Sequence, residues 1–177
     1  MFYALRGLVL CAILIGTTAG AQGQQPGGTD SVTLPGERGV APPYGQPITL
    51  AQAERAIVAA RTEAARLKSG EIAIAVADTH GELVAFVRMD DTAIHSILYA
   101  QLKARAAARV RRFTATPPPE IAAAVATTPD FVGTPGGVPI VVNGKTIGAI
   151  GVSGGRSGEE DEKCAVAGAA AIEATLK

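Results

Sequence analysis

The dipeptide Asn143-Gly144 lies between two apolar segments, Val138–Val142 and Lys145–Val152. A two-residue hairpin turn needs positive φ at both central positions, and Asn-Gly is a pair that adopts this conformation at little cost. The segment therefore predicts an antiparallel hairpin. The pairs Gly136-Gly137 and Gly154-Gly155 mark its two ends. Glycine at such positions favours close approach of the backbone to a neighbouring subunit or a ligand.

A second hairpin is predicted earlier in the chain. Ile72–Ala77 and Leu83–Val87 resemble strands, and Asp78-Thr79-His80-Gly81 between them has the composition of a turn. His80 lies in this turn, where histidine tolerates positive φ. Every residue of the first strand is apolar, which is typical of a strand that is covered on both faces.

Helices are predicted around the two hairpins. The first begins at Thr49, which has capping-box spacing to Gln52, and ends at Gly70. A long helix follows at about 92–111, a short one opens with Thr116-Pro117 and runs to about 126, and the last opens at Ser157. The inner face of the long helix is expected to consist of Ile94, Ile97, Leu98 and Leu102.

The order of these elements predicts the fold class. Helix, hairpin, helix, short helix, hairpin and helix follow one another along the chain. Each hairpin supplies antiparallel strands, and the helices can cover both faces of the sheet that they form. We therefore expect an α/β (α+β) protein, built as a three-layer α/β/α sandwich with a mainly antiparallel sheet.

The first 21 residues have the layout of a secretory signal peptide. Arg6 precedes the apolar run Leu8–Gly16, and Ala19-Gly20-Ala21 is a small-residue cleavage motif. The run is too short to span a bilayer, and no second one follows, so a secreted or periplasmic product without a membrane partner is expected. Residues 22–46 are rich in Gly, Pro and Gln and predict a disordered linker. One folded domain, 47–177, remains.

Charge and cysteine content exclude several classes of function. The chain has 16 basic and 16 acidic residues, and this balance lacks the basic excess that a nucleic-acid partner requires. Cys11 falls within the predicted signal peptide, so Cys164 is left without an internal disulfide partner and is expected to pack in the core. The sequence contains no Cys-x-x-Cys pair, histidine-rich metal motif or Walker loop.

Three segments of the chain resemble the GlcG/HbpS family, which includes the C-terminal domain of PduO. They are DTHGELVAFVRMDD at 78–91, SILYAQLKARAAA at 96–108, and the segment from GGVPIVVNGKTIGAIGVSGG to EEDEKCAVAGAAAI at 136–172. The resemblance covers about 49–176. It implies a profilin-like fold with about five strands, and members that bind haem, in some cases degrade it, and tend to form homo-oligomers.

Haem binding requires an apolar slot and usually an axial ligand, and this chain offers two histidines. His95 lies in the first turn of the long helix, with Tyr99 one turn further on and Met89 close in sequence. His80 lies in the predicted hairpin turn. The resemblance does not distinguish between the two, so either histidine is a candidate ligand, and a polar surface role is the alternative for both.

Cationic residues on the long helix are candidates for contact with propionates or phosphate. Arg105, Arg109 and Arg112 share one face, and a solvated helix surface or an oligomer contact is the alternative. Lys103 follows Ser96 by one heptad, so the two side chains could face the same pocket. Snorkelling of Lys103 from the edge of the core is the alternative.

Four acids, from Glu159 to Glu162, fill the first turn of the last helix. They complement the helix dipole and would repel a phosphate, which excludes a nucleotide loop here. Glu159 and Glu162 are spaced i, i+3, so a weak hard-cation site is the alternative to helix capping. The glycines of this region are expected to form a pocket wall; they are Gly136, Gly137, Gly154 and Gly155.

Three hypotheses of function follow from these residues and from the resemblance. The first is an exported, homo-oligomeric haem-binding protein of the GlcG/HbpS type, with or without haem breakdown. The second is an enzyme or accessory domain that binds a small metabolite between the glycine-rich hairpin and the long helix. The third is a sensory or structural partner of another exported protein. A haem titration separates the first from the other two.

Overall fold

The computed structural model describes residues 40–129 and 131–173. Helices and strands follow one another along this part of the chain in the order that the sequence predicts. The elements are α1 (Leu50–Leu67), β1 (Ala73–Ala77), β2 (Leu83–Arg88), α2 (Ile94–Val110), α3 (Pro119–Thr127), β3 (Gly137–Val142), β4 (Lys145–Ser153) and α4 (Gly158–Glu173).

The sheet has the strand order β2-β1-β4-β3, and all neighbouring strands are antiparallel. The expectation of about five strands is wrong for the described residues, which contain four. A short stretch before α1 takes the place of a fifth: Tyr44 forms a single parallel bridge with Thr146 of β4. Pro43 and Pro47 flank this bridge and lack the N–H donors that a longer ladder needs.

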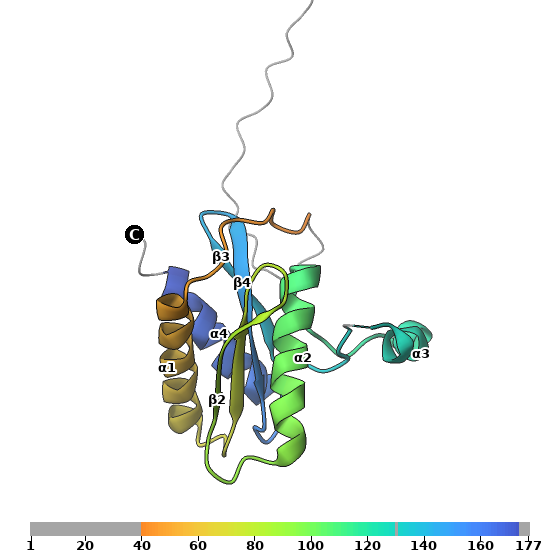
Figure 1. Ribbon diagram of the computed structural model, residues 1–177. Coiled ribbons are helices and arrows are strands. Elements are labelled where there is room, and N and C mark those ends of the chain that lie inside the picture. Colours follow the sequence, from red (N-terminus) through yellow and green to blue (C-terminus); the bar gives the residue numbers. More distant parts are fainter. Residues whose placement is uncertain (1–39, 130, 174–177) are drawn as a thin grey trace, which may run out of the picture. The chain divides into compact units, whose positions relative to one another are not determined.

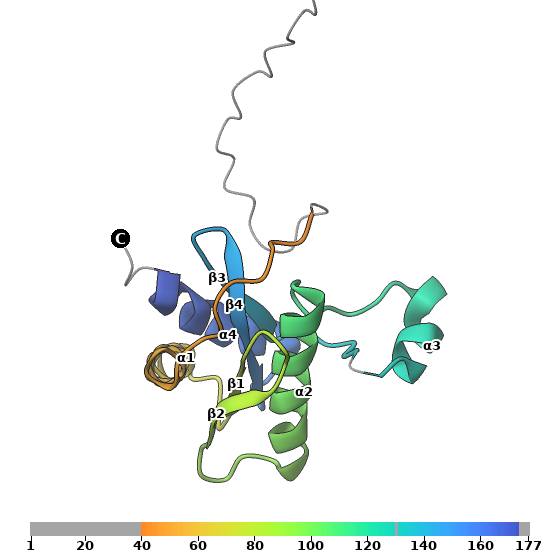
Figure 2. The same ribbon diagram turned by 45° about the horizontal axis from the view of Figure 1, so that its top comes forward.

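Helices cover both faces of the sheet, which confirms the three-layer α/β/α sandwich (Figures 1 and 2). α1 and α4 pack on one face, and α2 packs on the other. Alternate residues of β1 face the two layers: Ile74 and Val76 join the large core beneath α1 and α4, whereas Ala73 and Ala75 pack against α2. All five residues of β1 are buried, as its unbroken apolar sequence predicts.

The inner face of α2 differs from the prediction. Ile94 is 84% exposed and Leu98 is 58% exposed, so neither belongs to the core. Small residues and one lysine face the sheet instead; the buried residues are Ser96, Ala100, Lys103, Ala104, Ala106, Ala107 and Ala108. The cause lies in β4, because a Cβ added to Gly151 would collide with backbone atoms of α2. The helix lies too close to the sheet for large side chains to fit between them.

Turns and helix ends follow the local sequence at most positions. Asn143 and Gly144 have φ values of 50° and 70°, which confirms the predicted hairpin turn. Thr49 and Gln52 form the predicted capping box. The predicted end of α1 at Gly70 is wrong, because Lys68 already adopts the left-handed conformation that ends the helix.

The short helix α3 begins later than predicted. Pro117, Pro118 and Pro119 follow one another, and a residue that precedes proline is disfavoured in the helical region. The helix therefore begins at Pro119 instead of at Thr116-Pro117. None of its residues is buried, and it stands apart from the three layers in Figures 1 and 2.

The predicted signal peptide, 1–21, lies outside the described residues, as does most of the predicted linker, 22–46. The end of that linker packs on the domain: the Tyr44 hydroxyl donates to the backbone oxygen of Arg109, and Arg111 donates to that of Pro42. The chain thus already packs on the domain before residue 47, where the folded domain was predicted to begin. Within the described ranges, no helix combines the length and apolar character that crossing a bilayer would require.

Candidate functional site

A pocket of about 540 Å³ opens where the N-terminal half of α2 meets the end of β4 and the start of α4. This volume is within the usual range for small-molecule sites. Its wall combines the glycine turn after β4 with polar side chains from both helices. The lining residues are Ala93, His95, Ser96, Tyr99, Lys103, Thr134, Ser153, Gly154, Gly155, Ser157, Gly158 and Asp161.

A buried ion pair between Lys103 and Asp161 forms part of this wall. The Lys103 Nζ atom lies 2.8 Å from Asp161 Oδ2, and the two side chains are 3% and 7% exposed. Lys103 also donates to the backbone oxygen of Val152 at 2.9 Å, while Asp161 Oδ1 accepts from the backbone N–H of Gly155 at 2.8 Å. The pair thereby ties α2, the end of β4 and the start of α4 together.

Gly136 makes room for this pair. Its φ is +117°, a conformation that residues with a side chain rarely adopt. A Cβ at this position would lie 2.8 Å from Asp161 Cβ and 2.9 Å from Lys103 Nζ. Gly136 is therefore a support of the pocket and is not part of its lining.

The protonation of Asp161 is shifted by its surroundings. Burial raises the pKa of the Asp161 carboxyl, and the neighbouring Lys103 ammonium and the Gly155 N–H hold back part of that rise. Loss of water around the carboxylate thus outweighs the attraction of its partner. A carboxyl group of this kind, beside a cation and within a pocket, is typical of functional sites.

Two hydroxyl groups in the lining have no hydrogen-bond partner among the described residues. Ser96 is fully buried, and its Oγ atom is not bonded to any of them. Thr134 Oγ1 is in the same situation. Buried hydroxyls in folded proteins nearly always have partners. Ser96 and Lys103 line the same pocket, which confirms the placement that their heptad spacing predicts.

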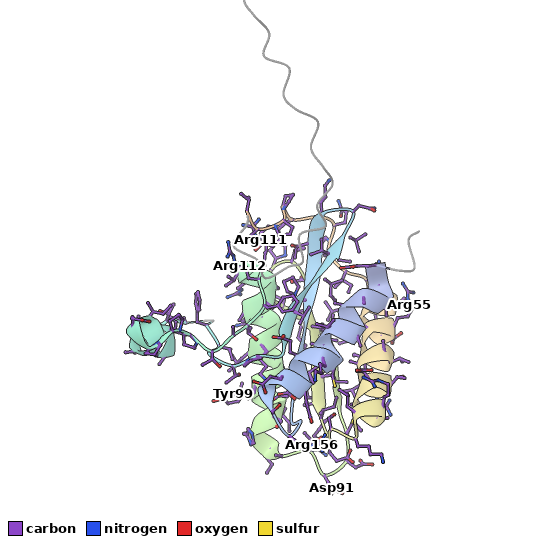
Figure 3. All side chains as sticks on the ribbon, turned by 180° about the vertical axis from the view of Figure 1, so that it is seen from behind. Arg55, Asp91, Tyr99, Arg111, Arg112 and Arg156 are labelled. Carbon is purple, nitrogen blue, oxygen red and sulfur yellow. The ribbon has the colours of Figure 1, made fainter. Side chains whose placement is uncertain are left out.

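His95 and Tyr99 line the mouth of the pocket. His95 is exposed, Tyr99 is 42% exposed, and their ring centroids are 6.0 Å apart in an edge-to-face arrangement. Figure 3 shows Tyr99 on the side of α2 next to the start of α4. The imidazole and the phenol are thus both accessible to a bound ligand.

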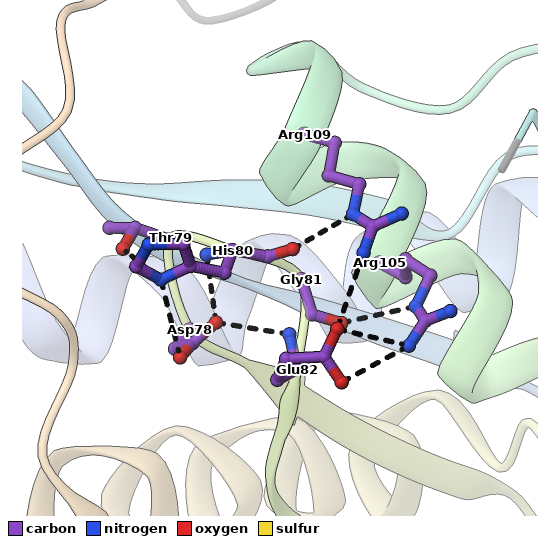
Figure 4. A network of polar contacts seen from close by, with 7 residues as sticks. All are labelled: Asp78, Thr79, His80, Gly81, Glu82, Arg105 and Arg109. Carbon is purple, nitrogen blue, oxygen red and sulfur yellow. Dashed lines mark hydrogen bonds and ion pairs between the residues drawn. The ribbon is translucent and has the colours of Figure 1, made fainter.

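Three other sequence-based candidates lie outside this lining: Met89 just after β2, Gly137 on β3 and Arg105 on α2. Met89 packs against the core beneath α1 and α4. Gly137 faces the backbone of α2, where a Cβ would collide with the carbonyl of Lys103. Arg105 and Arg109 both contact Glu82, and they donate to the backbone oxygens of Gly81 and His80 (Figure 4). The arginines thus hold the first hairpin turn against α2.

His80 lies in a separate cleft of about 530 Å³. Its φ is not positive, whereas that of Gly81 is +82°. Asp78 accepts hydrogen bonds from the backbone N–H groups of His80 and Glu82, and its second oxygen lies 3.8 Å from His80 Nδ1. The cleft also contains Tyr44 and Arg109. The two histidines therefore belong to different surfaces of the molecule.

The acids at the start of α4 do not act as one group. Glu160 binds Arg156, and its backbone N–H donates to Ser157 Oγ, as expected for helix capping. A hydrogen bond with Ser157 lowers the pKa of Glu159, whereas burial raises that of Glu162. Within 40–129 and 131–173, no cluster of three or more His, Cys, Asp or Glu side chains is placed to hold a metal ion.

Cys164 is fully buried and does not line the pocket. Its Sγ atom lies 3.9 Å from Ser69 Oγ. Burial raises the pKa of this thiol, which keeps it protonated and poorly nucleophilic. The expectation of a packing cysteine is confirmed.

Sequence reasoning missed the role of Asp161. An acid in the first turn of a helix is explained by capping alone, so nothing local distinguished Asp161 from its neighbours. The two partners of the ion pair are 58 residues apart. The one feature of the sequence that pointed to a buried acid was Lys103, because a lysine among the small inward-facing residues of α2 needs a buried counter-charge.

The fold and this pocket define a small α+β domain with a polar cavity, and comparison with known proteins places it in a family. Residues 48–170 match the family described as "Haem degrading protein HbpS-like". Since this match covers more than half of the chain, the protein belongs to the HbpS-like family, and the resemblance to GlcG/HbpS proteins is confirmed.

Individual relatives agree with this assignment. Protein GlcG of Escherichia coli strain K12 is 43% identical over 105 residues, which are 58% of this chain and 78% of GlcG. The structure of an HbpS double mutant from Streptomyces reticuli is 30% identical, with a TM-score of 0.62 over 82% of this chain and 97% of that one. A PduOC–haem complex is 26% identical, with a TM-score of 0.59 over 71% and 94%.

Proposed function

We propose that this protein binds haem at the mouth of the pocket between α2 and α4, with His95 as the iron ligand. The observation that carries the proposal is the position of His95 and Tyr99 together at the opening of that pocket. Imidazole and phenolate are both axial haem ligands in proteins. The family is described as haem-degrading, and one relative has been solved with haem bound.

The residues at the mouth fit one edge of a flat ligand. His95 supplies the nitrogen donor, Tyr99 supplies an aromatic edge, and the turn at Gly154-Gly155 presents backbone without side chains. Haem itself would supply a redox-active iron centre. Lys103 is already paired with Asp161, so it would not serve as a counter-charge for the propionates.

His80 is the second candidate ligand. The Asp78 carboxylate near Nδ1 can orient the ring and leave Nε2 free, an arrangement that is common for metal-bound histidines. Its cleft is independent of the one at His95. The two sites can therefore be tested one at a time.

A haemin titration of the purified protein, followed in the Soret region, tests the proposal. We expect a saturable, stoichiometric band that is lost in His95→Ala and retained in His80→Ala. The opposite pattern assigns the ligand to His80. If none of the three proteins gives a Soret absorbance above that of free haemin, haem binding is refuted. Far-UV circular dichroism of each variant controls for folding.

Haem breakdown, export and self-assembly extend the proposal. Breakdown is tested by adding hydrogen peroxide to the haem-loaded protein and measuring released iron against haemin alone. Export is tested by N-terminal sequencing of the protein recovered outside the cytoplasm, where a retained Met1 would contradict cleavage. Assembly into a homo-oligomer is supported by the exposed apolar side chains of Ile94 and Leu98 on α2.

Binding of a small metabolite in the same pocket is a second candidate function. The specific observation in its favour is the pair of buried, unpartnered hydroxyls at Ser96 and Thr134. Both are in the lining that contains the Lys103–Asp161 pair.

A further inference from the structure

One side of α2 is apolar near the start of the helix and basic near its end. Four residues form this side and are called the outer stripe; they are Ile94, Leu98, Arg105 and Arg109. Their spacing of i, i+4, i+11 and i+15 directs the four side chains within about 60° of one another around the helix axis. The residues of α2 that pack on the sheet lie around the opposite side of the helix. The outer stripe therefore points away from the sheet.

The apolar half of the outer stripe is open to solvent. Ile94 is 84% exposed and Leu98 is 58% exposed. Adjacent apolar side chains of this size, exposed on one helix, are typical of a surface that contacts another molecule. His95 and Tyr99 follow the two residues directly in the sequence and line the mouth of the pocket. The outer stripe therefore runs beside that mouth.

The two ends of the stripe carry opposite charge. Asp90 and Asp91 immediately precede α2 and are exposed, and neither carboxylate has a partner among the described residues. Arg88 offsets one of these two charges. At the other end, the two arginines of the stripe share the single acid Glu82, so a positive charge remains there (Figure 4). Figure 3 shows Asp91 and Arg112 at the two opposite ends of α2.

A surface with this pattern is complementary to a second copy of itself turned by 180°. In an antiparallel pair of α2 helices, the acidic start of each helix meets the basic end of the other, whereas a parallel pair would bring like charges together. A twofold contact also uses the same favourable pairing twice. Asp91 and Arg105 are each seven residues from Leu98, so pairing them places the twofold axis beside Leu98.

We propose that the outer stripe joins two copies of this chain in a twofold dimer, with the two α2 helices antiparallel and Leu98 at the axis. Asp91 of each copy pairs with Arg105 of the other, and Ile94 of each packs beside Leu102 of the other. This inference rests on the self-assembly part of the proposed function, for which it names the surface and the symmetry. It does not depend on haem binding, although the contact borders the mouth of each pocket.

Two charge-reversed variants test the pairing, with the mass of the full chain measured by light scattering over a dilution series. Asp91→Arg brings two cations together at both ends of the contact, and Arg105→Asp brings two anions together there. Each variant alone should dissociate at a concentration about tenfold higher than the wild type or more, because both symmetric pairs become repulsive.

An equimolar mixture of the two variants should restore the dimer. In the mixed pair, the reversed residue of each variant faces the reversed residue of the other, and the two unchanged residues also face each other. Opposite charges therefore meet at both ends again. This rescue is expected only for a twofold contact in which Asp91 meets Arg105, and a mixture that stays monomeric overturns the inference.

The control variants lie on α1, which covers the other face of the sheet. Val58 is 61% exposed, so Val58→Lys is matched to changes in the stripe, and Glu54→Arg reverses an exposed acid; both should keep the mass of the wild type. Far-UV circular dichroism controls for folding, since Arg105 also holds the first hairpin turn through Glu82. Asp91→Arg leaves that turn untouched and tests the contact by itself.

The outcomes separate this inference from the proposal on which it rests. If the wild type is an oligomer and Asp91→Arg keeps its mass and dilution behaviour, self-assembly stands and this surface is wrong. If the wild type is a monomer at every concentration up to its solubility limit, self-assembly fails and the inference falls with it. The haemin titration is read independently of either result.

Discussion

Replacing Lys103 by methionine tests whether the buried ion pair organises the pocket. Methionine keeps much of the length and apolar contact of the lysine stem but removes the ammonium. The change leaves the Asp161 carboxylate, which is 7% exposed, with the Gly155 N–H as its remaining partner, and takes a donor from the Val152 carbonyl. Removing one member of a buried pair costs about 3–5 kcal/mol, because the other charge stays desolvated.

That loss is a large fraction of the total stability of a domain, which is about 5–15 kcal/mol. With a urea m-value of about 2 kcal/mol/M, the unfolding midpoint should fall by about 2 M. The chain has no Trp, so far-UV circular dichroism is the suitable signal.

Two control variants test the cause of this loss of stability. In the Lys103→Met, Asp161→Asn double variant the uncompensated charge is gone, so at least half of the lost stability should return. Arg66→Met removes an exposed pair with Glu63 and should leave the midpoint unchanged. A Lys103→Met midpoint equal to that of the wild type would refute the reasoning, since it would mean that Asp161 is hydrated in the native state.

Other parts of the structure yield three further predictions. The raised pKa of Asp161 means that its contribution to the free energy of unfolding is greatest below the ordinary value of 3.8 and is lost as pH rises through the folded value; Asp161→Asn should remove this slope in urea titrations. Gly151→Ala should lower the free energy of unfolding, measured by denaturation, by about 3 kcal/mol. Gly144→Ala should lower it by about 1–2 kcal/mol, because no atom lies within 4 Å of the added Cβ but φ is +70°. Ile94→Lys with Leu98→Lys should convert an oligomer to monomer by light scattering with unchanged circular dichroism, and an unaltered mass would contradict this interface.

Features governed by neighbouring residues were predictable from the sequence. Asn143-Gly144 specifies a hairpin turn through its own backbone conformation, and Thr49 with Gln52 specifies a helix start through hydrogen bonds within one turn. The unbroken apolar run of β1 required a covered strand, and the strand is central in the sheet. In each case the physical cause acts over a few residues, so the local sequence contains it.

The orientation of α2 was not predictable in this way. The usual rule places large apolar residues inside, yet Ile94 and Leu98 are exposed and Ala100 and Ala104 are buried. The deciding factor is the glycine on β4 at position 151, which brings the helix backbone close to the sheet. Only the pairing of strand and helix reveals that the space between them is too narrow for leucine or isoleucine.

The chain by itself determined the class of fold, the hairpins and the residues from which a pocket could be built, including Lys103, His95 and the glycines after β4. The tertiary structure decided which of them meet. Lys103 finds Asp161 across 58 residues of sequence, whereas Met89 and Arg105 contact other parts of the molecule. The physical reason is that a buried charge must be paired and a helix must pack closely, and both demands are met by partners that are distant along the chain.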